Sequence, residues 1–226
     1  LHAHVSEPAI KVYWEKRIPS ESWHKTDWTA LEHASNNISL GQRVSKTKRV
    51  TGMLGVGKFL FHWKAWNSPN CPRCQAGIPE DIEHVLTCPA NSTTWATVWN
   101  SWLDFFAKHP TYAGVENAIY DHLRAWRTGR PVSRDLSREN TPRGAAIRAQ
   151  SSVGWYNFLD GFIAREWRQM QHLYYEATKS RRSSLRWTSL LIRQCWVSTQ
   201  MLMQARTKAL EGDESELTEE LEHKLT

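Results

Sequence analysis

The stretch CPRCQAGIPEDIEHVLTC, residues 71–88, decides how this chain is organised. Two residues separate Cys71 from Cys74, nine more precede His84, and three lie between His84 and Cys88. A C-x-x-C turn can aim two thiolates at one ion, and residues four apart lie on the same face of a helix. This CCHC arrangement predicts that Cys71, Cys74, His84 and Cys88 complete one tetrahedral zinc site.

Four protein ligands leave no coordination position for water or substrate, so we expect one structural Zn²⁺ ion that activates no nucleophile. Because an unfolded chain lacks the preformed site, metal binding would contribute directly to the free energy of folding. Three thiolates against one dication leave a net charge of about −1, which Arg73 beside the site can offset. The alternative is a disulfide or a set of free buried thiols. Cys195 stands alone and is expected to be a core thiol.

The charge of the chain is unevenly distributed. The formal net charge is +6, but residues 211–226 hold seven of the 23 acidic residues and one of the 29 basic ones. Residues 1–210 therefore hold 28 basic against 16 acidic residues, a formal charge of +12. Such a balance favours a polyanionic partner, with nucleic acid ahead of a membrane surface. The alternative is ordinary solubilising charge.

The first residues, LHAHVSEPAIKVYWEKRI, lack the continuous apolar segment of a signal peptide. No stretch is long and apolar enough to span a bilayer, so we expect no membrane partner. Four Cys without a secretion signal point to a reducing, intracellular compartment. The chain does not begin with Met, and we expect it to be a piece of a longer polypeptide.

Apolar residues recur at helical intervals, and 13 Trp supply large side chains for a core, so we predict a mainly α fold with a small CCHC zinc-binding module. The clearest helix pattern follows the cysteine cluster, with Asn91 and Ser92 as candidate caps. A second pattern stops at Gly129 and Pro131, as helix-ending residues should. Further helices are expected over 22–36, over 40–54, from about 143 with one apolar stripe from 153 to 170, and over 185–210.

These patterns suggest a sequential organisation along the chain. The acidic tail is expected to be solvated or frayed. The expected segments are a helical lead-in (1–67), the zinc module with its following helices (68–130), a linker (131–142), a C-terminal helical region (143–210) and the tail (211–226).

The residues around the cysteine cluster carry a family resemblance. The string of Cys71, Pro72, Cys74, Glu80, His84, Leu86, Cys88, Pro89 and Trp95, preceded by Trp28, Arg43 and 61–63, resembles the zinc-binding region behind the reverse transcriptase of non-LTR retrotransposons. A second segment, 153–171, resembles a block in retroelement-derived proteins of unicellular eukaryotes. Together the matches cover about 28–196, and only the cysteine cluster is specific. Many members place four residues between the His and the last Cys, where this chain has three.

The resemblance implies a nucleic-acid-associated accessory domain of a polymerase polyprotein, acting on template RNA or target DNA in the nucleus. The upstream polymerase domain would be a partner, and this segment itself would not be catalytic. Sequence-tolerant phosphate contacts need exposed Lys and Arg, and single-strand binders add aromatic side chains such as Trp63 or Trp66. The candidate contacts are Lys46, Lys48, Arg49, Lys58, Arg73, Arg124, Arg127, Arg130, Arg134, Arg138, Arg143 and Arg148. The alternative is a solvated basic face with tryptophans in the core.

Other chemical signals are weaker. The string GMLGVGKF, residues 52–59, matches a phosphate-binding loop until Phe59 replaces the hydroxyl that holds magnesium. No paired Asp motif of a polymerase is present, and no Pro-Asp of a retroelement nuclease. A nuclease would require a carboxylate cluster assembled by folding from distant positions. A rival function is a protein-interaction module that docks on the polymerase or self-associates through Trp-rich helices.

Overall fold

The computed structural model describes residues 17–36, 38–132 and 136–225, with side chains as far as residue 211. Within these ranges the chain is helical and contains no named strand, which confirms the predicted mainly α fold. Two isolated antiparallel bridges join Asn70 to Pro79 and Thr26 to Ala164. No helix among the described residues is both long enough and apolar enough to cross a membrane.

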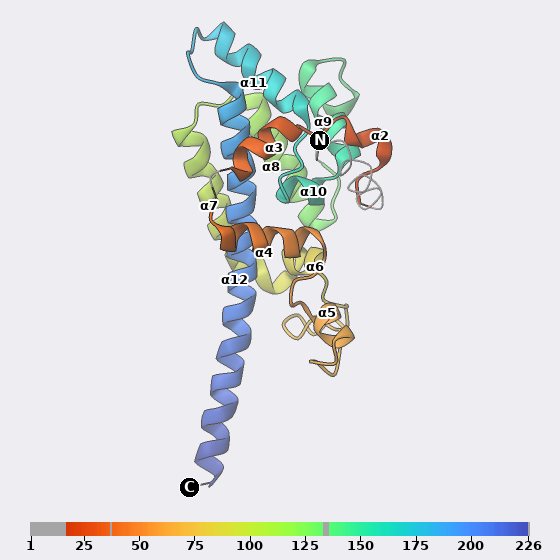
Figure 1. The fold of residues 1–226 in the computed structure, drawn as a ribbon, viewed down its shortest axis with the longest axis vertical. Helices are drawn as coiled ribbons and strands as arrows, with labels where there is room; N and C mark the ends of the chain where they lie inside the picture. Colours follow the sequence, from red (N-terminus) through yellow and green to blue (C-terminus); the bar gives the residue numbers. More distant parts are fainter. Residues whose placement is uncertain (1–16, 37, 133–135, 226) are drawn as a thin grey trace. The chain divides into compact units, whose positions relative to one another are not determined.

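Figure 1 shows the order of the helices along the chain. Two 3-10 turns, η1 (Pro89–Asn91) and η2 (Leu136–Arg138), interrupt the series. The α-helices are α2 (Ser20–Trp23), α3 (Trp28–Ser35), α4 (Leu40–Val50), α5 (Gly57–His62), α6 (Ile82–Thr87), α7 (Ser92–Lys108), α8 (Ala113–Thr128), α9 (Pro142–Val153), α10 (Trp155–Leu159), α11 (Arg165–Ala177) and α12 (Ser184–Leu225).

The described residues form two compact units that are discontinuous in sequence. The first unit holds 17–44 and 103–196, and the second holds 45–102 and 197–225. The divisions fall inside α4, α7 and α12. Segments distant in sequence therefore share a core in each unit, whereas the organisation expected from the sequence is sequential.

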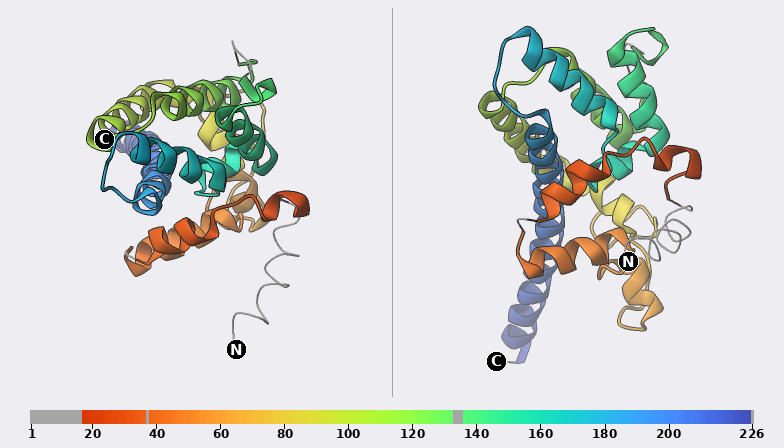
Figure 2. Two further views of the ribbon diagram at one scale, coloured as in Figure 1. Left: turned by 90° about the horizontal axis from the view of Figure 1, so that it is seen from above. Right: turned by 45° about the horizontal axis from the view of Figure 1, so that its top comes forward.

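The first unit is built on the start of α12. Ser189 and Arg193 of α12 donate hydrogen bonds to the carbonyl oxygens of Ala30 and Ala34, both at 3.3 Å, so that α3 lies beside α12 (Figure 2). Trp187, 2 % exposed, donates from Nε1 to Thr111 Oγ1 at 2.9 Å. Trp187 is thus buried with its polar atom paired, as buried Trp requires.

Two glycines break the apolar stripe predicted from 153 to 170. Gly154 has φ 101° and Gly161 has φ 95°, and the chain forms α9, α10 and α11 in place of one helix. A Cβ on Gly161 would lie 2.8 Å from Trp196 Nε1, so this turn needs both the positive φ and the missing side chain. The prediction of one continuous helical stripe was wrong, because the spacing of apolar residues does not show where the backbone changes direction.

Other helix ends follow local signals. Gly129 ends α8 at φ 64°, and the Thr141 side chain accepts from Gly144 N at the start of α9, as caps do. The helix expected over 22–36 is split into α2 and α3, since Asp27 caps α3 by accepting from Ala30 N at 3.0 Å. The last helix does not end at 210. Its backbone continues to Leu225, through a tail rich in Glu and Leu that have high helix propensity.

The second unit packs the later part of α12 against the residues around the cysteine cluster. Val56, Ile82 and Val85 form a buried apolar cluster, and Met203 of α12 packs against it. Trp102, fully buried, donates from Nε1 to Ser198 Oγ at 2.9 Å. This core holds α6, which carries part of the candidate site.

Candidate metal centre

A short ribbon positions the first two cysteines. Cys71 N donates to the Ile78 carbonyl and Glu80 N donates to the Pro69 carbonyl, both at 2.8 Å. Between these two hydrogen bonds the chain turns back through residues with positive φ, 51° at Gln75 and 66° at Gly77. The turn therefore lies at the end of a short antiparallel ribbon, at the bridge between Asn70 and Pro79.

Helix α6 positions the other two ligands. Asp81 caps the helix by accepting from His84 N at 2.8 Å. The helix then ends, and Cys88 follows it with extended backbone. The cap fixes where α6 starts. Cys88, expected on the same helix face as His84, instead lies just past the end of the helix, where its backbone is no longer helical.

The four donor atoms converge. All of them lie within 4.8 Å of one another, with Cys71 Sγ 3.9 Å from Cys88 Sγ and Cys74 Sγ 3.4 Å from His84 Nε2. Donors about 2.3 Å from one ion at the corners of a tetrahedron are about 3.8 Å apart, which matches these separations. The group could therefore hold one metal ion. Among the described residues, no other group of three or more His, Cys, Asp or Glu does so.

Burial and mutual contact shift the thiols in opposite directions. Burial, with the nearby thiols of Cys71 and Cys74, raises the pKa of Cys88 to about 12. Burial also opposes ionisation of Cys74, but hydrogen bonds from the Ala76 backbone and from Cys71 and Cys88 outweigh it and lower the pKa of Cys74. Crowded thiols cannot all ionise without a cation, so a metal ion would complete the charge of the site.

A network of hydrogen bonds joins the cysteine turn to the helix region. Arg73 donates from Nη1 to Asn91 Oδ1 at 2.7 Å, and Asn91 Nδ2 donates to the Val85 carbonyl at 2.6 Å. Trp95 Nε1 donates to the Leu86 carbonyl at 2.7 Å. These bonds satisfy carbonyls at the end of α6, where helix carbonyls lack partners within the helix.

A buried ion pair joins the ribbon to α12. Glu80, fully buried, accepts from Gly57 N at 2.7 Å and from Arg206 of α12. A Cβ on Gly57 would lie 2.9 Å from the Pro69 carbonyl oxygen. The glycine that resembles part of a phosphate-binding loop thus donates its amide to a carboxylate and packs on the ribbon.

Asn91 and Arg206 were not identified from the sequence as parts of this site. Asn91 was predicted only as a helix cap, whereas its side chain pairs with Arg73 and with the Val85 carbonyl. Arg206 lies 126 residues from its partner Glu80, and nothing in the local sequence connects them.

Comparisons with protein-family models, with curated proteins and with solved structures find no match to this chain.

The basic residues predicted as phosphate contacts differ in exposure within the second unit. Lys48 and Lys58 are exposed, and Lys46 is half-buried. Arg49 is only 4 % exposed, so its guanidinium is not presented to solvent. Arg73 is occupied by the hydrogen bonds described above.

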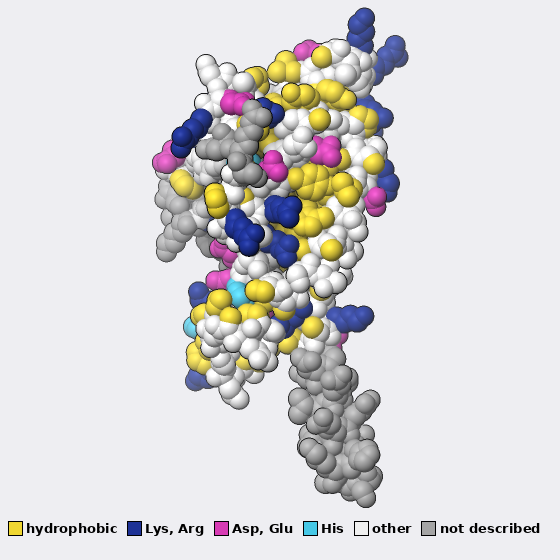
Figure 3. Space-filling model, turned by 180° about the vertical axis from the view of Figure 1, so that it is seen from behind, with side chains coloured by type: hydrophobic (Ala, Val, Ile, Leu, Met, Phe, Trp, Pro, Cys, Tyr) yellow, Lys and Arg dark blue, Asp and Glu magenta, His cyan; other side chains and the backbone are white. Residues whose placement is uncertain are grey.

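In the first unit, Arg124, Arg130 and Arg138 are exposed, whereas Arg127 is half-buried. Burial, with the neighbouring Arg124 charge, lowers the pKa of Arg127. Arg134 lies outside the described residues. Figure 3 shows one face of the molecule, on which Lys and Arg side chains lie among exposed hydrophobic ones.

Two of the arginines predicted to contact phosphate, Arg143 and Arg148, bind a turn of this chain. Arg143 pairs with Glu139 at 3.0 Å, and Arg148 donates to the carbonyl oxygens of Ser137 and Glu139. Their guanidiniums bind the η2 turn ahead of α9. This use of arginine satisfies backbone carbonyls that a loop leaves without partners.

Proposed function

We propose that this chain is a zinc-stabilised, nucleic-acid-binding accessory domain from behind the reverse transcriptase of a non-LTR retrotransposon. It would bind template RNA or target DNA inside the cell, in the nucleus, beside the polymerase domain of the same polyprotein. The observation that carries the proposal is the convergence of Cys71, Cys74, His84 and Cys88, the group on which the family resemblance rests.

The donor set supports zinc over other metals. Three thiolates and one imidazole in a tetrahedral arrangement suit Zn²⁺, whereas magnesium and calcium prefer oxygen ligands. Cys71, His84 and Cys88 are buried at 4 %, 8 % and 2 % exposure, which suits a structural ion without a solvent ligand.

Charge supports nucleic acid as the partner. The formal charge of +12 over residues 1–210 is accompanied by exposed cations, among them Lys48, Lys58, Arg124 and Arg130, which form no ion pair within the described residues. Binding through such residues releases counterions and depends strongly on salt.

The test is a salt titration of RNA and DNA binding by the zinc-loaded full chain, followed by fluorescence anisotropy. We expect log K to fall linearly with log salt, and Arg124→Ala with Arg130→Ala to reduce the slope by about 2. Lack of binding at about 50 mM salt would contradict the proposal.

Exposed apolar residues favour a second candidate function, a protein-interaction module. In the second unit Met53, Phe61, Trp63 and Ile78 are 54 %, 47 %, 60 % and 46 % exposed. Large aromatic side chains are enriched at protein-interaction sites, and exposed apolar patches mark such sites. Trp63→Ala would then abolish self-association or binding to the separate polymerase domain in sedimentation experiments, and would leave the salt dependence of nucleic-acid binding unchanged. Trp66 is a poorer candidate, because the Arg206 guanidinium lies 5.4 Å from its ring centroid.

A further inference from the structure

A basic pocket in the first unit lies outside the residues predicted from the sequence. It has a volume of about 470 Å³, and its lining includes His109, Tyr175, Arg181, Arg182, Arg186 and Trp187. None of its lining residues is acidic. A volume of this size accommodates a nucleotide-sized ligand.

The floor of the pocket is rigidly held. Trp187 and Tyr175 are 2 % and 4 % exposed. Trp187 Nε1 donates to Thr111 Oγ1 at 2.9 Å, and Tyr175 Oη donates to the Pro110 carbonyl at 3.2 Å. Both aromatic side chains are therefore held by hydrogen bonds to the segment after α7.

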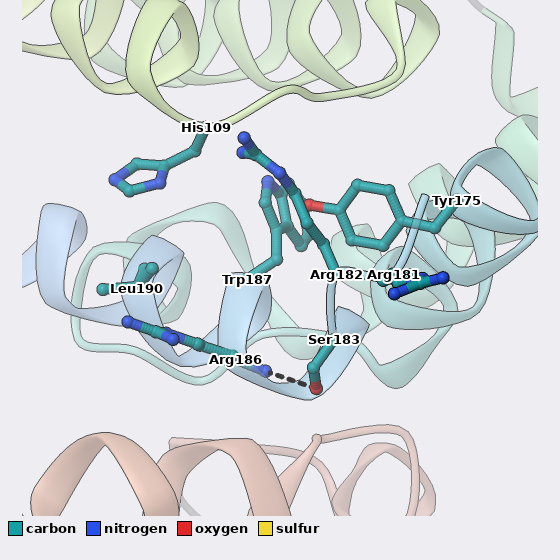
Figure 4. Close-up of a pocket in the computed structure, with 8 residues that line it drawn as sticks. All are labelled: His109, Tyr175, Arg181, Arg182, Ser183, Arg186, Trp187 and Leu190. Atoms are coloured by element: carbon teal, nitrogen blue, oxygen red, sulfur yellow. Dashed lines mark hydrogen bonds between the residues drawn. The ribbon is translucent and has the colours of Figure 1, made fainter. Parts of the chain in front are cut away.

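The arginines of the pocket lack anionic partners. Arg181, Arg182 and Arg186 are exposed, and in the part of the chain that the structure describes none of their guanidiniums forms an ion pair. In Figure 4, Arg182 extends toward the side where His109 lies, Arg186 lies beside Leu190, and Arg181 extends away from Arg186. The start of the 42-residue helix α12, at Ser184, adds positive potential from the helix dipole.

The charges affect the imidazole in the pocket. Burial, followed by the positive charges of Arg182, Lys108 and Arg186, lowers the pKa of His109. Burial makes the largest contribution, and the three positive charges add to it in the same direction.

We propose that this pocket binds a phosphate group, and that its occupant is the terminal phosphate of a nucleic-acid strand. Guanidinium forks recognise phosphate oxygens with charge-assisted hydrogen bonds. A terminal phosphate carries a charge of about −1.5 to −2 at neutral pH, more than the single charge of a backbone phosphate. It therefore suits a pocket that Arg182 and Arg186 line and that has no carboxylate in its lining. The end of a strand can also enter a concave pocket, whereas the middle of a strand would have to pass across its opening.

This inference rests in part on the proposed nucleic-acid function, so the experiment separates the two. Binding of a 12-nucleotide strand with a 5′-phosphate is compared with that of the same strand with a 5′-hydroxyl, for RNA and for DNA. In parallel, inorganic pyrophosphate is titrated while the His109 ring resonance is followed by NMR, after assignment with His109→Gln.

The variants are Arg182→Ala and Arg186→Ala, with Arg165→Ala as the matched control. Arg165 is also exposed and without an ion pair in the described residues of the first unit, and it does not line this pocket. All three variants remove one surface charge, and circular dichroism checks that each remains folded.

We expect the 5′-phosphate to strengthen binding about tenfold, and each pocket variant to remove most of that gain while Arg165→Ala keeps it. Pyrophosphate should raise the pKa of His109. If pyrophosphate does so and no strand binds, the pocket binds phosphate, but the strand end as its occupant and the nucleic-acid function are both overturned. If strands bind with the expected salt dependence, equally with either end, and pyrophosphate leaves His109 unchanged, the pocket proposal is overturned and the nucleic-acid function stands.

Discussion

Arg206 of α12 donates two hydrogen bonds to the carboxylate of Glu80, from Nε to Oε1 at 3.0 Å and from Nη2 to Oε2 at 2.6 Å. Glu80 is fully buried and Arg206 is 6 % exposed. The same carboxylate accepts from Gly57 N at 2.7 Å. One buried ion pair therefore joins the late part of α12 to the ribbon beside the metal ligands.

Removing one partner of this pair should destabilise the second unit severely. We expect Arg206→Met to cost about 3 to 5 kcal/mol in the free energy of unfolding, because it leaves the Glu80 carboxylate buried without its counter-ion. The double variant Glu80→Gln with Arg206→Met should cost less than the sum of the single variants. Urea unfolding measures all three. Lys208→Met, at an exposed position of α12, is the control and should stay within about 0.5 kcal/mol. Additive costs in the double variant would show that the two side chains do not act as a pair.

Metal removal should unfold the region around the cysteine cluster. Elemental analysis of the purified full chain is expected to give one zinc per chain. Cys74→Ser and His84→Ala should each lose the ion, and a strong chelator should reduce the helical circular dichroism of the wild type, because ligand convergence without a cation leaves crowded thiols.

Cys195→Ala provides the control for metal binding. Cys195 is fully buried and belongs to the first unit, outside the donor group. This variant should keep one zinc per chain even if it lowers stability. Retention of zinc by both Cys74→Ser and His84→Ala would contradict the assignment of the ligands.

Two glycines, both with positive φ, separate backbone strain from steric clash. Gly161→Ala adds a Cβ 2.8 Å from Trp196 Nε1 and 2.9 Å from Ile192 Cγ2, at φ 95°. Gly129→Ala adds one at φ 64° with no atom within 4 Å. We expect about 1 kcal/mol of destabilisation at Gly129 from the backbone alone, and about 2 to 4 kcal/mol at Gly161. Thermal unfolding measures both, and equal costs would mean that the close packing of Gly161 on α12 is absent in solution.

The lowered pKa of His109 gives stability a pH dependence. Burial and the charges of Arg182, Lys108 and Arg186 favour the neutral imidazole in the folded state. The unfolded chain therefore binds a proton more readily, and the contribution of His109 to stability, present above a pH of about 6.5, should be lost as the pH falls. Urea unfolding of wild type and His109→Gln at pH 7.5 and pH 5 measures it. The wild type should lose more stability than the variant over this range. A larger loss in the variant would reverse the sign of the inferred shift.

Much of the metal site was predictable because its determinants are local. The ligands lie within residues 71–88, the ribbon and turn need only nearby hydrogen bonds, and Asp81 caps the helix that carries His84. The helix α7 after the cluster and the stop of α8 at Gly129 were also predicted, and the structure confirms both. Zinc itself, and nucleic acid as the partner, stay predictions from the residue types.

The uses of individual arginines were less predictable. Arg143 and Arg148, expected to contact phosphate, bind the turn at Glu139, and Arg49 is buried. The spacing of these arginines along the sequence is like that of Arg124, which is exposed. Whether a guanidinium meets a carbonyl, a carboxylate or solvent depends on what the chain brings beside it.

The sequence by itself determined the helical class, the cysteine cluster and the basic charge, since periodicity, ligand spacing and composition act over a few turns of chain. Only the tertiary structure decided the pairing of Arg206 with Glu80, the close packing of Gly161 on Trp196, and the pocket that joins His109 to Arg182 and Arg186. These features join segments distant along the chain. Burial is the physical reason. A buried charge needs a partner and a close-packed turn needs a neighbour, and folding can supply either from a distant part of the chain. The local sequence does not identify that distant residue.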